Sequence, residues 1–185
     1  MRADARKNYS HLLAVASAVV SEQGAEASLR DIARRADVGL ATLYRHFPTR
    51  EALLEALLHA RFDELTQTAA ELEASASPDE ALLSWFREAM AFTHTYGGVF
   101  EVLAVALADA ESALHASCAG VRSAGAQLLE RAQAAGLART DIDGTDLLAL
   151  IAALGWLSEQ PPFTSRADHL VDVIAGAVLT RRKKR

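Results

Sequence analysis

Side chains that can donate hydrogen bonds to phosphate oxygens or to the edges of DNA bases gather in one short stretch of the chain. They are Thr42, Tyr44, Arg45, His46 and Arg50. Thr42 also carries a methyl group suited to a thymine methyl, and Tyr44 carries a flat ring with a polar tip. Just upstream, Arg30 could reach a guanine edge, and the Ser28 hydroxyl could meet the nucleic-acid backbone.

Three helices are expected to position these groups. Apolar residues recur at helical spacing from Tyr9 to Val20, so a first helix should run until Gly24. Ser28 is expected to be the N-cap of a second helix, with Asp31 completing a capping box. A break at 37–39, attributed to Gly39, leads into a short third helix at 40–47, which Pro48 ends. Two short helices joined by a tight turn and braced by a preceding helix are typical of a helix-turn-helix, with Leu43 and Phe47 turned into its core.

The charge of the chain is unevenly distributed. The whole sequence has 185 residues and a net charge of -5. Residues 1–50 carry +3, residues 181–185 are all basic, and residues 51–180 carry -13. A basic head on an acidic body indicates that only the head approaches phosphates.

The remainder of the chain also has a helical pattern. Thr49 is expected to cap a fourth helix, and Pro78 to open a fifth, with Ser77 and Glu80 as its capping pair. Four further helices are expected near 99–109, 112–135, 145–159 and 165–182. The sequence therefore predicts an all-α protein, with a three-helix DNA-binding domain at 1–48 and a helical ligand-binding and dimerisation domain at 49–185.

Residues 28–54 resemble the signature of the tetracycline-repressor (TetR) family. Its most specific part is Ala-Thr-Leu-Tyr-Arg-His-Phe at 41–47, followed by Arg50 and by Ala-Leu-Leu at 52–54. The resemblance implies a homodimeric regulator that binds a palindromic operator in double-stranded DNA, and we expect a repressor that a small molecule releases. Together, the residues and the resemblance suggest these DNA contacts: Ser28, Arg30, Leu40, Ala41, Thr42, Tyr44, Arg45, His46 and Arg50. Three positions depart from the usual pattern: Asp37 replaces a glycine, Gly39 a serine cap, and Arg50 a lysine.

Aromatic and apolar residues in the larger domain are candidates for a ligand pocket. Because TetR-like proteins bind their inducer between these helices, we assign the pocket to Trp85, Phe86, Met90, His94, Phe100 and Trp156. Such a pocket would be mostly apolar with a few polar groups. Ordinary core packing is the alternative for each of these residues.

The last two predicted helices are apolar on more than one face, which suits a four-helix bundle between two subunits. We assign the dimer interface to Leu147, Ile151, Leu154, Leu170, Ile174 and Val178. The alternative is that these residues are buried within one subunit.

Other features carry less chemistry. His115 and Cys118 could be half of a zinc site, but no second pair of ligands lies nearby, so we expect no metal and no cofactor. The acidic residues at 141–146 are interpreted as a linker and a helix cap, and the basic residues 181–185 as the end of the last helix. No nucleophile–base spacing supports an enzyme, although an all-helical enzyme or small-molecule carrier with an incidental helix-turn-helix remains an alternative. A single cysteine, no secretory signal and no membrane-length apolar stretch indicate a cytoplasmic bacterial protein.

Overall fold

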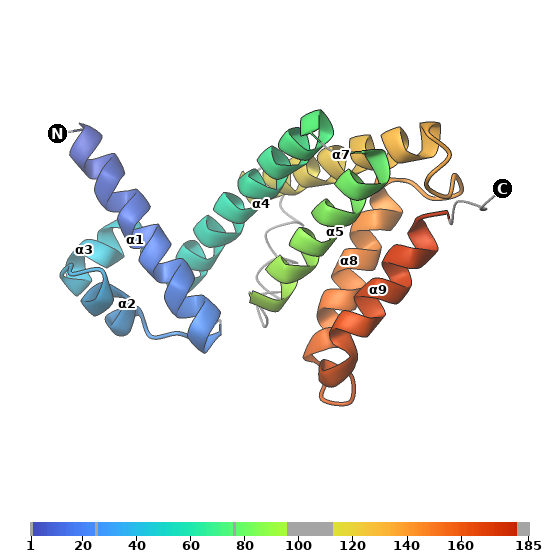
Figure 1. The fold of residues 1–185 in the computed structure, drawn as a ribbon. Helices are drawn as coiled ribbons and strands as arrows, with labels where there is room; N and C mark the ends of the chain where they lie inside the picture. The colour runs from blue at the N-terminus through green and yellow to red at the C-terminus, as the bar shows by residue number, and fades with distance from the viewer. Residues whose placement is uncertain (1, 25, 76, 96–112, 181–185) are drawn as a thin grey trace. The chain divides into compact units, whose positions relative to one another are not determined.

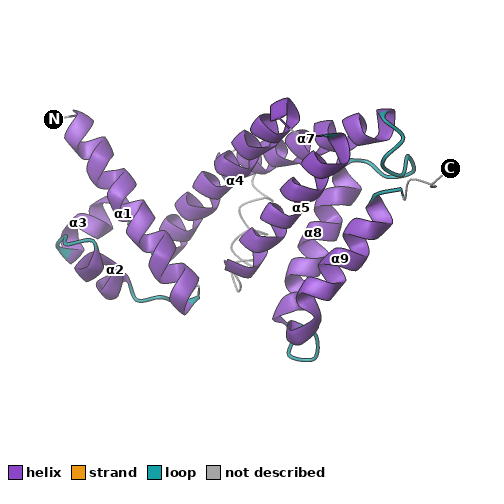
Figure 2. Ribbon diagram, in the orientation of Figure 1, coloured by secondary structure: helices purple, strands orange, loops and turns teal. Residues whose placement is uncertain are grey.

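The computed structural model describes residues 2–24, 26–75, 77–95 and 113–180. In these ranges the regular structure is helical, as predicted (Figures 1 and 2). The α-helices are α1 (Arg2–Gln23), α2 (Leu29–Arg35), α3 (Leu40–His46), α4 (Arg50–Ser75), α5 (Pro78–Thr95), α7 (Ala113–Ala134), α8 (Gly144–Glu159) and α9 (Ala167–Val178), and a 3-10 turn, η1, spans Thr164–Arg166. The helix predicted at 99–109 lies outside the described residues. None of the helices in these ranges has the length and hydropathy needed to span a bilayer.

The chain divides into two compact units, with Ala60 and Arg61 on either side of the division and α4 continuous through it. The first unit, Met1–Ala60 with Thr95–His115, contains α1, α2, α3 and the first turns of α4, and we refer to its residues 2–60 as the head. The second unit, Arg61–His94 with Ala116–Arg185, is referred to as the body. The domain boundary predicted after residue 48 lies just before α4 begins.

The head is held together by an apolar core to which each of its helices contributes. Leu12 and Ala16 from α1, Ile32 from α2 and Leu43 from α3 are all buried. Phe47, directly after α3, is buried as well. The prediction that Leu43 and Phe47 face the core, four residues apart on one helical face, is confirmed.

The turn between α2 and α3 is made by Asp37 and not by Gly39. Asp37 has a φ of 53°, whereas Gly39 has an ordinary φ of -66°. The Val38 amide donates to the Ala33 carbonyl (3.0 Å), and the Asp37 amide donates to the Arg34 carbonyl (3.3 Å). This pair of bonds is the Schellman motif, whose left-handed position normally holds glycine. The attribution of the turn to Gly39 was therefore wrong, and the aspartate takes the glycine's place.

The predicted helix starts have different outcomes. Thr49 caps α4, since its Oγ1 accepts from the Ala52 amide at 3.1 Å. Ser28 occupies the N-cap position of α2, but its side chain makes no capping hydrogen bond. The capping box expected between Ser28 and Asp31 is thus absent, because the Asp31 carboxylate is bound by other donors. Before α5, the Ser77 hydroxyl donates directly to Glu80 Oε2 (2.7 Å).

In the body, α5 packs tightly against α7 and α8. The Trp85 indole is almost fully buried, and its Nε1 donates to the Leu65 carbonyl of α4 at 3.0 Å. A Cβ at Gly125 of α7 would lie 2.5 Å from the Trp85 ring, and one at Gly155 of α8 would lie 2.7 Å from Thr93 Cβ. Glycine at 125 and 155 therefore allows these helices to approach α5 more closely than any other residue would.

The ends of the last two helices differ in part from prediction. Asp143 and Asp146 form a complete capping box at the start of α8, which confirms the helix-cap interpretation, and the helix begins at Gly144, one residue before the predicted start. Helix α9 ends at Val178, earlier than predicted, because the chain becomes extended there and the Thr180 amide donates to the Leu137 carbonyl (2.9 Å). The basic residues 181–185, interpreted from the sequence as the end of the last helix, lie outside the described residues.

Candidate nucleic-acid interface

Helix α2 has one apolar side and one cationic side. Ile32 and Ala33 are buried, whereas Arg30 and Arg34 are exposed. Because they are four residues apart, Arg30 and Arg34 lie on the same outer face of the helix. The exposed face of α2 thus presents two guanidinium groups.

Helix α3 exposes the side chains expected of a recognition helix. Tyr44 is 45% exposed, and Ala41 and Arg45 are exposed beside it, while Leu43 on the opposite side is fully buried. Leu40 and Thr42 are half-buried. Tyr44 is therefore accessible to a ligand from the outer face of α3.

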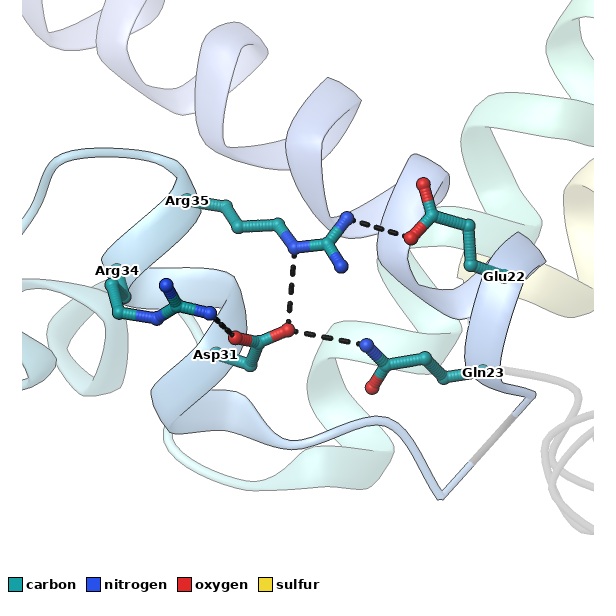
Figure 3. A network of polar contacts seen from close by, with 5 residues as sticks. All are labelled: Glu22, Gln23, Asp31, Arg34 and Arg35. Atoms are coloured by element: carbon teal, nitrogen blue, oxygen red, sulfur yellow. Dashed lines mark hydrogen bonds and ion pairs between the residues drawn. The ribbon is translucent and has the colours of Figure 1, made fainter.

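The cationic side chains of the head separate into paired and unpaired groups. Arg34 pairs with Asp31, and Arg35 pairs with Glu22 at 2.7 Å and with Asp31 at 3.3 Å (Figure 3). Within the described parts of the chain, Arg30 and Arg45 make no hydrogen bond or ion pair, so their guanidinium groups are available to a ligand. An unpaired arginine on an exposed face is suited to binding phosphate or a guanine edge.

Arg50 was predicted to contact phosphate, and it also has a contact within the protein. Its Nη1 donates to the Ala27 carbonyl at 2.8 Å, which ties the start of α4 to the loop before α2. The residue is half-buried. An arginine used in this way helps to hold the helices of the head together, and its role toward DNA stays a prediction.

His46 belongs to an aromatic cluster that sequence analysis did not identify. Its ring centroid lies 5.9 Å from that of Tyr9 and 6.3 Å from that of Phe47, and Tyr9 lies 5.4 Å from Phe47. Tyr9 is 36% exposed and comes from the middle of α1, so it forms part of the surface next to the end of α3. Periodicity assigned Tyr9 to a helix but gave no signal of its contact with α3.

Four of the residues proposed for a ligand pocket have described side chains, and three of these four are buried. Trp85, Phe86 and Met90 are buried in the core of the body, as the core-packing alternative requires, whereas Trp156 is 55% exposed on α8. Phe86 borders a small void of about 10 Å³, shared with Leu82 among others. The side chains of His94 and Phe100 lie outside the described residues.

Most residues assigned to the dimer interface are buried inside a single subunit. These are Leu147, Ile151, Leu154 and Val178, whereas Leu170 and Ile174 are half-buried. The apolar residues that face outward on the same two helices are Ala149, Ala152, Ala153 and Trp156 on α8, and Val173, Gly176 and Ala177 on α9. Periodicity located the helices correctly but did not separate the inner face from the outer one.

Metal binding at His115 and Cys118 has no geometric support. Among the described residues, no three His, Cys, Asp or Glu side chains are placed to hold a metal ion together. Burial raises the pKa of the Cys118 thiol, which favours the protonated form and disfavours the thiolate that metals bind. This cysteine is consistent with a packed thiol.

Two family models match the chain and together cover most of it. Residues 12–57 match the bacterial regulatory proteins of the tetR family, and residues 77–176 match the C-terminal domain of SbtR-like transcriptional regulators. No curated protein sequence matches the chain.

Solved structures similar to the chain extend over nearly its full length. A TetR transcriptional regulator from Streptomyces coelicolor is 35% identical, with a TM-score of 0.72, over 94% of this chain and 99% of the other. A TetR regulatory protein from Mycobacterium vanbaalenii is 30% identical, with a TM-score of 0.67, over 97% and 99%. AibR, in complex with isovaleryl coenzyme A and operator DNA, shares the fold at 19% identity and a TM-score of 0.60, over 92% and 97%. The exposed helix-turn-helix, the helical body and these similarities lead to one conclusion: the chain belongs to the TetR family of transcriptional regulators.

Proposed function

We propose that this protein represses transcription by binding a palindromic operator as a homodimer, and that a small molecule releases it. The observation that carries the DNA-binding part is the outer face of the head, where Tyr44 is exposed and Arg30 and Arg45 have no partner among the described residues. Helix α3 would lie in the major groove, with Tyr44 and Thr42 near base edges and Arg45 and His46 near phosphates.

Dimerisation through α8 and α9 would supply the symmetry that a palindrome requires. Two recognition helices must reach half-sites about 34–36 Å apart, which a two-fold dimer can achieve. The exposed apolar residues of α8 and α9 support this arrangement, because Trp156 and Val173 are large apolar side chains that one subunit leaves half or more exposed. The proposed interface therefore moves from the buried residues named above to this outer face.

Release by a ligand would act through α4. This helix begins at Arg50, four residues after α3 ends, and continues to Ser75, where its second half is part of the body. The Trp85 indole holds the Leu65 carbonyl of α4, so a ligand that rearranged the body core would also move α4. A ligand shifts this equilibrium only as far as it prefers the conformation that does not bind DNA. The crystal structure of AibR with both isovaleryl coenzyme A and operator DNA supports this division of tasks within the fold.

Selection of genomic fragments tests the proposal. The purified protein is mixed with fragmented DNA of the source genome at moderate salt, and the bound fragments are sequenced. We expect one enriched palindrome with half-sites about one helical turn apart. Recovery of fragments without any shared sequence, by protein shown to be folded and free of bound small molecules, would contradict the proposal.

A further inference from the structure

The carboxylate of Asp31 is the centre of a five-residue network between α1 and α2. Its Oδ2 accepts from Gln23 Nε2 at 3.2 Å and pairs with Arg35 Nε at 3.3 Å, while its Oδ1 pairs with Arg34 (Figure 3). Arg35 also reaches Glu22 at 2.7 Å. The Asp31 side chain is only 18% exposed, so this carboxylate is better shielded from solvent than those of typical surface ion pairs.

The two arginines in this network differ in how they are held. Arg35 has two acidic partners, Glu22 and Asp31. Among the described residues, Arg34 has one acidic partner, Asp31. The Arg34 side chain is 76% exposed and lies on the same outer face of α2 as Arg30. Without the Asp31 carboxylate, Arg35 would keep Glu22, but Arg34 would be a second unpaired cation beside Arg30.

We propose that Asp31 is a specificity-determining residue, which keeps Arg34 from binding phosphates without regard to sequence. An arginine that contacts only phosphate strengthens binding to every DNA sequence and adds no discrimination between sequences. By pairing Arg34, Asp31 leaves Arg30 as the available arginine of α2 and so raises the ratio of operator binding to non-specific binding. This inference rests on the proposed DNA-binding function.

The test compares Asp31→Asn with wild type on two duplexes. One duplex carries the palindrome enriched from the genome, and the other has the same length and base composition in random order. For each protein, the association constant is measured over a series of salt concentrations. For Asp31→Asn, we expect several-fold tighter binding to the random duplex and a salt dependence steeper by about one unit of slope, because one more phosphate contact is made. The ratio of specific to non-specific affinity should fall.

Two further variants separate this effect from net charge and from folding. Asp37→Asn also removes one negative charge from the head, but the exposed Asp37 has no ion pair among the described residues. It should therefore change the specificity ratio much less than Asp31→Asn does. The double variant Asp31→Asn/Arg34→Met should return the salt slope to the wild-type value, because the released arginine is then absent.

Three results would overturn the inference. The first is a folded Asp31→Asn variant with the wild-type ratio of specific to non-specific affinity and the wild-type salt slope. The second is an Asp37→Asn variant that changes this ratio as much as Asp31→Asn does. The third is a double variant whose salt slope stays as steep as that of Asp31→Asn. Failure of wild type to bind either duplex would contradict the proposed function itself, and so can be told apart from failure of this inference, in which wild type binds normally.

Discussion

The head and the body of this protein are both helical, but they differ in which residue types form the functional surface. That surface is polar in the head and apolar in the body. In the head, buried apolar residues such as Leu43 fix the helices, and the exposed polar residues such as Tyr44 and Arg45 form the candidate site. In the body, both the core and the proposed dimer surface are apolar, as Leu147 inside and Val173 outside illustrate. Function can therefore be inferred from residue type in the head, whereas in the body the position of each residue has to be known.

The largest effects on stability and on dimerisation should come from substitutions on the two apolar faces of the body, one inside the subunit and one outside. Leu147→Ala removes a fully buried side chain and should lower the free energy of unfolding by about 2–5 kcal/mol. Val173→Glu, on the outer face of α9, should leave the folded subunit intact and convert dimer to monomer. Thermal unfolding and analytical ultracentrifugation measure the two effects. A stable Val173→Glu dimer would contradict the proposed interface.

Substitution of a closely packed glycine in the body should have a somewhat smaller effect on the free energy of unfolding. Gly125→Ala places a methyl group 2.5 Å from the Trp85 ring and should destabilise the body by about 1–3 kcal/mol. Gly120→Ala in the same helix is the matched control, because the nearest atom to its added methyl is Thr66 Oγ1 at 3.6 Å, an ordinary van der Waals contact, and alanine favours helix by about 1 kcal/mol. Chemical denaturation of both variants compares them. Equal stability of the two would show that α7 does not approach Trp85 this closely.

These comparisons also show what the sequence can predict. Helix bounds and the inward direction of Leu43 and Phe47 follow from local periodicity, and the family signature lies within one continuous segment. The contact of Tyr9 with His46 and the hydrogen bond from Arg50 to Ala27 join separate segments, so no local pattern contains them. The network around Asp31 also joins separate segments, α1 and α2. In addition, an aspartate at the start of a helix has the same local pattern whether it completes a capping box or forms an ion pair. An apolar helix face likewise has the same pattern whether it packs within a subunit or between subunits.

A smaller effect on stability is expected from a substitution in the turn between α2 and α3. Asp37→Gly should stabilise the protein by up to about 1 kcal/mol, because a left-handed φ of 53° is less strained for glycine than for aspartate. The loss of an exposed negative charge should also tighten DNA binding slightly. Denaturant unfolding with Asp37→Asn as a control separates conformation from charge, since asparagine removes the charge but keeps a side chain. Destabilisation by glycine would contradict the assigned turn.

The central claim is that the exposed face of α3 recognises a DNA sequence, and Tyr44 tests it most directly. Binding of wild type and Tyr44→Ala to the enriched palindrome is compared by fluorescence anisotropy, with circular dichroism to verify the helical content. We expect a loss of about tenfold or more in affinity for the palindrome, with helical content unchanged and little change on a random duplex. Unchanged affinity of Tyr44→Ala for the palindrome would contradict the assignment of α3 as the recognition helix.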